Sequence, residues 1–84
     1  MAYTYILYSH EIDRYYIGST SSALEDRLRR HLSDHKGYTG RTKDWVCVWS
    51  MYYDAITDAR AMEAKIKRRK SRAYIQELIH SLGT

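Results

Sequence analysis

The sequence contains no proline, no phenylalanine and no asparagine, and it has one cysteine and four glycines. The single cysteine, Cys47, excludes an internal disulfide framework and any zinc site built from several thiolates, and it fits a reducing, cytoplasmic compartment. With no proline and few glycines there is no flexible linker, so we expect one domain over residues 1–84. The apolar run at residues 3–8 is far too short to span a bilayer, so no membrane partner is expected.

Tyrosine and positive charge are what the chain has in excess. Nine tyrosines and two tryptophans supply every aromatic side chain, and each carries a polar atom that needs a partner when buried. The net charge is +4, but it is unevenly placed: residues 1–35 hold four basic and five acidic side chains, and residues 36–84 hold ten and five. This asymmetry predicts an anionic partner for the second part of the chain.

The first part of the sequence predicts a hairpin followed by a helix. Residues 3–9 and 14–18 are dense in aromatic and β-branched types, and the short polar stretch between them predicts an antiparallel pair. Ser22 and Glu25 have the spacing of a capping box, and the stripe of Leu24, Leu28 and Leu32 predicts a helix over residues 22–34.

The second part predicts a strand and two helices. A polar loop leads into a third strand over residues 45–53. Thr57 or Asp58 can cap a second helix, and the change in the angle of the apolar stripe predicts a break near Lys70 and Ser71 before a third helix, with Gly83 as its C-terminal cap. The predicted fold is α+β: a small three-stranded antiparallel sheet with helices packed around it, in the order β-β-α-β-α-α.

Glu63 is the most informative candidate residue. Its helical position falls within the apolar stripe of Ala59, Met62 and Ile66, where an unpaired carboxylate is costly. A salt bridge at the rim of the core and a metal ion each explain such a residue, and the pattern does not choose between them.

Arg27 and His31 lie four residues apart on the first predicted helix, so both can face one site. Arginine matches two phosphate oxygens, and histidine can donate a hydrogen bond or move a proton. The alternative is an ordinary solvated helix face. Tyr5 and Tyr16 belong to the predicted hairpin, where packing is the default role, but a phenol beside a cation becomes a candidate for proton transfer.

Basic side chains form two groups after residue 35. Residues 65–72 contain basic side chains and no acidic ones, so these side chains repel one another, and a polyanion would relieve that repulsion. A solubilising face is the alternative, and the length of the run favours nucleic acid. The candidate nucleic-acid-binding residues are Lys36, Arg41, Lys43, Lys65, Lys67, Arg68, Arg69, Lys70 and Arg72.

Together these residues resemble the GIY-YIG nuclease superfamily, the catalytic domain of excision-repair and homing endonucleases, and in particular its small single-domain members. The resemblance covers nearly the whole chain. The matching segments, in family order, are Tyr3-Thr4-Tyr5, Tyr16-Ile17-Gly18, Arg27 with His31, Tyr38-Thr39, residues 59–67 with Glu63, and Lys70-Ser71-Arg72. The first motif has Tyr3 and Thr4 instead of glycine and isoleucine, and the C-terminal asparagine of many larger members is missing.

The resemblance implies a metal-dependent endonuclease that hydrolyses DNA, with low sequence specificity or guided by DNA structure, in repair or recombination. It implies one Mg²⁺ or Mn²⁺ ion on Glu63, charge stabilisation by Arg27, and Tyr5 or Tyr16 as general base, or His31 as a proton relay. Because an ordinary phenol is a poor base at neutral pH, we expect Arg27, His31 or the metal to lower the tyrosine pKa. A homodimer or a targeting protein is a further expected partner, and RNA is an alternative substrate.

Two other functions compete with this hypothesis. The altered first motif and the missing asparagine are compatible with a nucleic-acid-binding module that keeps the nuclease fold but does not cut. An interaction adaptor is the third possibility, and it requires an exposed aromatic patch of Trp45, Trp49, Tyr52 and Tyr53.

Overall fold

The computed structural model describes residues 1–32 and 42–82, and within them all side chains except those of residues 30–32 and 82. In these residues three strands and three helices follow one another in the predicted order, β-β-α-β-α-α, which confirms the α+β fold class. The elements are β1 (Ala2–Ser9), β2 (Arg14–Thr20), α1 (Leu24–Leu32), β3 (Val46–Tyr53), α2 (Ile56–Arg69) and α3 (Arg72–Leu82).

The sheet is antiparallel throughout and has the strand order β2-β1-β3. Strand β1 is central, so both of its backbone edges are paired, whereas among the described residues β2 and β3 each have one edge without a partner strand. The register of the hairpin places Tyr5 opposite Gly18 and Thr4 opposite Ser19. This pairing brings Tyr3-Thr4-Tyr5 of β1 beside Gly18, Ser19 and Thr20 of β2.

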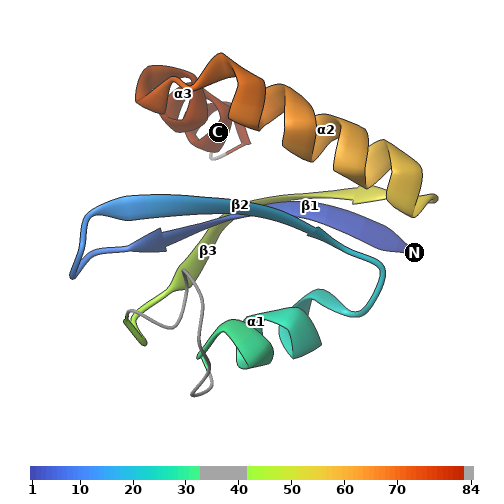
Figure 1. Cartoon of the computed structure of the whole chain (residues 1–84), viewed down its shortest axis with the longest axis horizontal. Helices are drawn as coiled ribbons and strands as arrows, with labels where there is room; N and C mark the ends of the chain where they lie inside the picture. The colour runs from blue at the N-terminus through green and yellow to red at the C-terminus, as the bar shows by residue number, and fades with distance from the viewer. Residues whose placement is uncertain (33–41, 83–84) are drawn as a thin grey trace.

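Helices cover both faces of the sheet (Figure 1): α2 and α3 lie on one face and α1 lies on the other. Because successive side chains of a strand point to opposite faces, Ile6 packs with Ile66 and Ile75 beneath α2 and α3. Tyr5 and Leu7 belong to the core beneath α1. The burial of both faces explains why residues 3–8 lack the polar and apolar alternation of a half-exposed strand.

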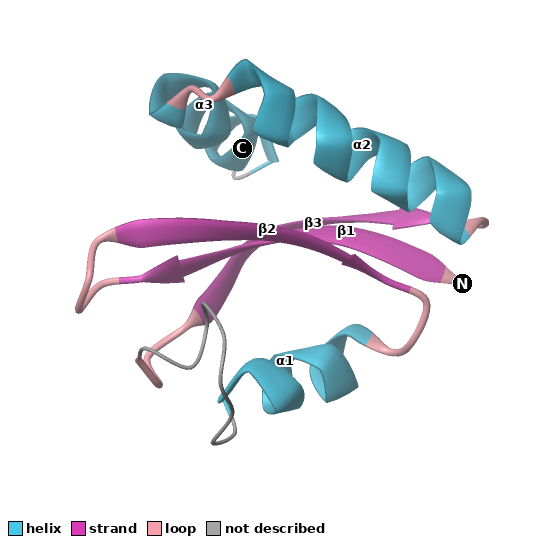
Figure 2. Ribbon diagram, viewed as in Figure 1, coloured by secondary structure: helices cyan, strands magenta, loops and turns pink. Residues whose placement is uncertain are grey.

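The same layers are visible in Figure 2, where α2 lies over the sheet at a shallow angle to β2 and the connection from β2 leads into α1. None of the helices in the described part of the chain has the length and apolar character needed to cross a membrane.

The starts of two helices differ from the sequence prediction. Helix α1 begins at Leu24, and among the described residues the capping box of Ser22 and Glu25 does not form, because the Ser22 hydroxyl is hydrogen-bonded to Thr20 Oγ1 at 2.8 Å. Helix α2 has Ala55 at its N-cap, without a side-chain hydrogen bond, and Thr57 lies inside its first turn. Strand β3 runs to Tyr53, so the short connection fixes the start of α2 ahead of the residues with capping side chains.

The predicted break between the second and third helices is confirmed. Lys70 adopts the left-handed conformation with φ 48°, and its backbone N–H donates to the Lys67 carbonyl. The Ser71 hydroxyl accepts a hydrogen bond from the Tyr74 N–H at 3.2 Å and so caps the start of α3. Gly83, the predicted C-terminal cap, lies outside the described residues.

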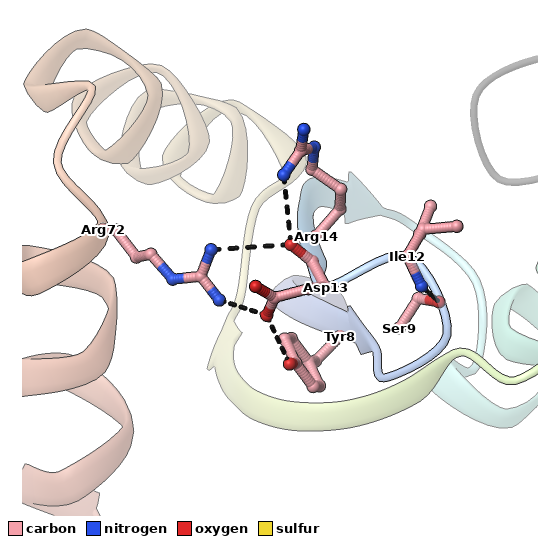
Figure 3. A network of polar contacts seen from close by, with 6 residues as sticks. All are labelled: Tyr8, Ser9, Ile12, Asp13, Arg14 and Arg72. Atoms are coloured by element: carbon pink, nitrogen blue, oxygen red, sulfur yellow. Dashed lines mark hydrogen bonds and ion pairs between the residues drawn. The ribbon is translucent and has the colours of Figure 1, made fainter.

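A polar cluster fastens α3 to the β1–β2 hairpin (Figure 3). The Asp13 carboxylate accepts a hydrogen bond from the Tyr8 hydroxyl at 2.6 Å and forms an ion pair with Arg72. The hydrogen bond from Tyr8, followed by that from Arg72, holds the pKa of Asp13 below its usual value. Arg14 donates to the Asp13 carbonyl at 3.3 Å, so the cluster brings Arg14 and Arg72 to the same corner of the molecule.

The aromatic patch required by the adaptor hypothesis does not exist. Trp45 is only 2% exposed and Trp49 only 4%, because each is packed into one of the two cores. Of the four residues predicted to form the patch, Tyr52 is exposed and Tyr53 is half-buried. The structure therefore removes the observation on which the adaptor hypothesis depended.

Candidate functional site

Three of the candidate residues meet at the free edge of β2, although they come from different elements. Tyr5 lies on β1, Arg27 on α1 and Glu63 on α2. Arg27 Nε donates a hydrogen bond to the Tyr5 hydroxyl oxygen at 3.2 Å. Glu63 is near enough for its negative charge to raise the pKa of both Tyr5 and Arg27, although other causes are larger. The helices on opposite faces of the sheet thus contribute to one site across its edge.

Gly18 makes this meeting possible. A Cβ atom at this position would lie 2.6 Å from the Tyr5 hydroxyl oxygen and 2.7 Å from its Cζ, closer than real Cβ contacts. Since Gly18 has no side chain, the Tyr5 phenol occupies the space beside β2 and reaches Arg27. Ser19, the next residue, points to the other face and donates a hydrogen bond from Oγ to Glu63 Oε1 at 2.5 Å.

Replacing Gly18 by alanine is expected to destabilise the fold by about 1–3 kcal/mol, because the added methyl group must push the buried Tyr5 ring aside. The same displacement breaks the Arg27 contact. Urea unfolding measures the first effect. Ser50→Ala, which faces Tyr5 from the opposite strand and adds no atom, is the control. An unchanged unfolding free energy for Gly18→Ala would show that the close packing of Tyr5 against β2 is wrong.

The Glu63 side chain is 22% exposed, and both carboxylate oxygens have partners. Ser19 binds Oε1, and Lys67 Nζ forms an ion pair with Oε2 at 2.7 Å. The salt bridge that the sequence left open therefore exists, but Lys67 is half exposed and its pair with Glu63 is a weak one. Within the described residues no group of three or more histidine, cysteine, aspartate or glutamate side chains could hold a metal. A carboxylate beside a hydroxyl suits a hydrated Mg²⁺ ion, which keeps most of its waters.

A polar cavity of about 340 Å³ opens beside Arg27 and Ser19. Its lining combines hydroxyl groups with two guanidinium groups, which are the donors that bind phosphate oxygens. The residues that line it are Ser19, Thr20, Ser21, Ser22, Arg27, Ile56 and Arg60. Ser19 lines this cavity and is hydrogen-bonded to Glu63, so the cavity lies beside the Glu63 carboxylate.

The two candidate tyrosines differ in their surroundings. Burial raises the pKa of Tyr5 more than the hydrogen bond from Arg27 lowers it, so its phenol is protonated at neutral pH. The sequence predicted that a nearby cation would lower the tyrosine pKa, whereas the pKa of Tyr5 is raised. The cost of desolvating the phenolate is larger than the stabilisation that Arg27 gives it. Tyr16 is half-buried, and its ring centroid lies 6.5 Å from that of Tyr5.

The basic run does not form one continuous face. Successive residues of a helix are spread around its axis, so Lys67 and Lys70 lie on the flank toward β2, whereas Arg69 stacks on Tyr74 with its guanidinium carbon 4.4 Å from the ring centroid. Lys65 and Arg68 are exposed on α2, and Lys43 is exposed ahead of β3. Lys36 and Arg41 lie outside the described residues, as does the side chain of His31.

Sequence reasoning missed two residues that border the site, Arg60 and Ser19, and one that borders the pocket next to it, Arg14. Arg60 lies three positions before Glu63 on α2 and lines the polar cavity, a spacing that could have identified it. Ser19 follows Gly18 directly, but a lone serine gives no periodic signal. Arg14 borders a second, apolar pocket on the other side of Lys67, and only the folded chain brings it there.

Comparison with known proteins gives one finding. The family model described as GIY-YIG catalytic domain matches residues 1–76, a range that contains Tyr5, Arg27 and Glu63 together with every residue of the polar cavity. Searches of curated proteins and of solved structures returned no match.

Proposed function

The chain belongs to the GIY-YIG family, whose catalytic domains are nucleases that act on DNA, and from this premise we propose that it is a metal-dependent endonuclease hydrolysing DNA phosphodiester bonds. The observation that carries the proposal is the meeting of Tyr5, Arg27 and Glu63 at the free edge of β2. We place the protein in the cytoplasm on the strength of its single cysteine.

Phosphate binding is assigned to the polar cavity. Arg27 and Arg60 offer guanidinium forks, and the hydroxyls of Thr20, Ser21 and Ser22 add further donors. Arg27 is fixed by its hydrogen bond to Tyr5, so its charge is already oriented when the phosphate arrives. That preorganised charge stabilises the negative charge that develops on the phosphoryl oxygens during hydrolysis.

Glu63 is the residue that would hold the divalent cation, with Ser19 orienting its carboxylate. Mg²⁺ or Mn²⁺ bound there supplies charge neutralisation at the scissile phosphate and its leaving oxygen. Lys67 shares the Glu63 carboxylate and is exposed, so it can turn away toward a phosphate of the DNA when the carboxylate takes the cation.

The tyrosines divide two tasks. Tyr5 keeps its proton and positions Arg27 through its oxygen atom. Tyr16 is the more open of the two phenols, and we assign it to accepting the proton of the attacking water, with Arg27 on the neighbouring side of the site. His31 is a candidate relay for the same proton.

We expect low sequence specificity, or recognition of DNA structure, because of where the described helices lie. Every helix in the described part packs on the sheet, and none stands apart as a reading element for a DNA groove. One site cuts one strand, so a double-strand break needs a second copy, successive nicks or a targeting protein.

The test is cleavage of end-labelled single-stranded, duplex and branched DNA, each with Mg²⁺, with Mn²⁺ and with EDTA. We expect cuts only when a divalent cation is present, and with a stronger dependence on the shape of the DNA than on its sequence. DNA bound in every condition but never cut would overturn the proposal and leave the non-catalytic binding module. The same series with RNA identifies the substrate class.

A further inference from the structure

A second pocket lies on the other side of Lys67, where the free edge of β2 meets the bend between α2 and α3. Its volume is about 290 Å³, and its inner surface is almost entirely apolar. Tyr15, Ile17, Ile66 and Ile75 form the walls. Ser71 and four cationic side chains complete the lining: Arg14, Lys67, Lys70 and Arg72.

The rim of this pocket keeps unbalanced positive charge. Lys67 is paired with Glu63 and Arg72 with Asp13, but within the described part of the chain Arg14 and Lys70 form no ion pair. The Arg72 guanidinium also lies over the Tyr15 ring, 5.2 Å from its centroid, so a cation and an aromatic wall form one unit. An apolar interior with a cationic rim fits a ligand that has an apolar, planar body and negative charge at its ends.

The pocket adjoins the proposed active site. Lys67 lines the pocket and binds Glu63, and Glu63 is held by Ser19, which lines the polar cavity. The order along the edge of β2 is therefore polar cavity, carboxylate, apolar pocket. A DNA strand with its scissile phosphate between the polar cavity and Glu63 has its next nucleotide on the opposite side of Glu63, at the apolar pocket.

We infer that this pocket receives one unpaired base of the DNA substrate, while the rim cations bind the phosphates on either side of that base. The inference rests on the proposed function and names its substrate class: DNA with a base outside the duplex. Small-ligand pockets measure roughly 300–1,000 Å³, so a pocket at the lower limit has room for a single base. A base that is already unpaired costs least to place there.

The experiment measures binding of the wild-type protein in EDTA, where no cutting is expected. Three fluorescent DNA hairpins are compared by anisotropy: a fully paired stem, the same stem with one bulged adenosine, and the same stem with an abasic residue at the bulge. We expect the bulged adenosine to bind about tenfold more tightly than the abasic residue, because only the base differs between them.

Two variants separate the base from the phosphates. Ile17→Phe fills the pocket and is expected to abolish the preference for adenosine over the abasic residue, whereas Val46→Phe, at an exposed position on β3, keeps it. The second variant is Lys70→Asn. Lys70 is exposed and has a left-handed backbone conformation, which asparagine tolerates. This variant is expected to weaken binding of all three hairpins by a similar factor and to reduce the salt dependence.

Equal affinity for the bulged and abasic hairpins overturns the pocket assignment, and so does an unchanged preference in a folded Ile17→Phe protein. Wild type that cuts DNA in Mg²⁺ without preferring the bulged base keeps the nuclease function and refutes only the pocket. Wild type that prefers the bulged base but never cuts supports the pocket and refutes the nuclease.

Discussion

Replacing Glu63 by glutamine is expected to reduce DNA cleavage in Mg²⁺ by at least about 100-fold, because the carboxylate is the proposed ligand of the cation. Glutamine has the same shape, and its oxygen can still accept the hydrogen bond from Ser19. The ion pair with Lys67 is lost, but a pair this exposed contributes only about 0.2–1 kcal/mol. The variant therefore separates loss of the cation from loss of the fold.

Glu77→Gln is the matched control, since Glu77 is an exposed glutamate on α3, away from the site. Cleavage rates at several Mg²⁺ concentrations and thermal unfolding curves should be recorded for both variants and the wild type. We expect Glu77→Gln to cut like the wild type. Wild-type cleavage by Glu63→Gln would remove the metal-binding role of Glu63 and, with it, the reason to place the active site at this edge.

Replacing Arg27 by alanine is expected to lower the cleavage rate by about 10²–10³-fold, the usual cost of removing one preorganised charge from a reacting centre. Arg27 joins the Tyr5 hydroxyl to the polar cavity, so the substitution removes both a proposed phosphate ligand and a hydrogen-bond partner of a buried phenol. We expect most of the loss in the rate under saturating DNA. Lysine should restore little, because one ammonium group cannot hold Tyr5 and a phosphate in a fork.

Arg29→Ala provides the control on the same helix. Arg29 is 79% exposed and forms only a surface ion pair with Asp26, so its removal changes the net charge equally without touching the cavity. Single-turnover cleavage and DNA affinity should be measured for both variants. If both lose the same amount of activity, Arg27 acts through general attraction of DNA, and its assignment to the developing charge is wrong.

The sequence contains most of the information for the fold. Two short aromatic and β-branched segments separated by polar residues become the β1–β2 hairpin, and the shift in the angle of the apolar stripe near Lys70 becomes the bend between α2 and α3. These features are local, because a strand period or a helix period is set by neighbouring residues. The helix starts were predicted less well, since the Ser22 hydroxyl binds Thr20 ahead of α1 and the short connection after β3 sets the start of α2.

The sequence predicted the individual residues of the candidate site but not that they lie close together in the fold. Glu63 is a candidate because a carboxylate falls within an apolar stripe, Arg27 because it shares a helix flank with His31, and Tyr5 because of its place in the first motif of the family. These residues lie on different elements. Nothing in the sequence shows that the layers meet at an edge. The position of β2 at the side of the sheet, with Gly18 opposite Tyr5, is what allows contact across it.

The sequence by itself determined the α+β class, the family and the candidate carboxylate, arginine and tyrosines, since these depend on local pattern and residue type. Only the tertiary structure decided that Trp45 and Trp49 are core residues and that the basic run is divided between two flanks of α2. It also decided that burial holds the proton on Tyr5. Exposure, desolvation and the meeting of distant side chains depend on which surfaces the chain buries, and packing of all the layers together fixes those surfaces.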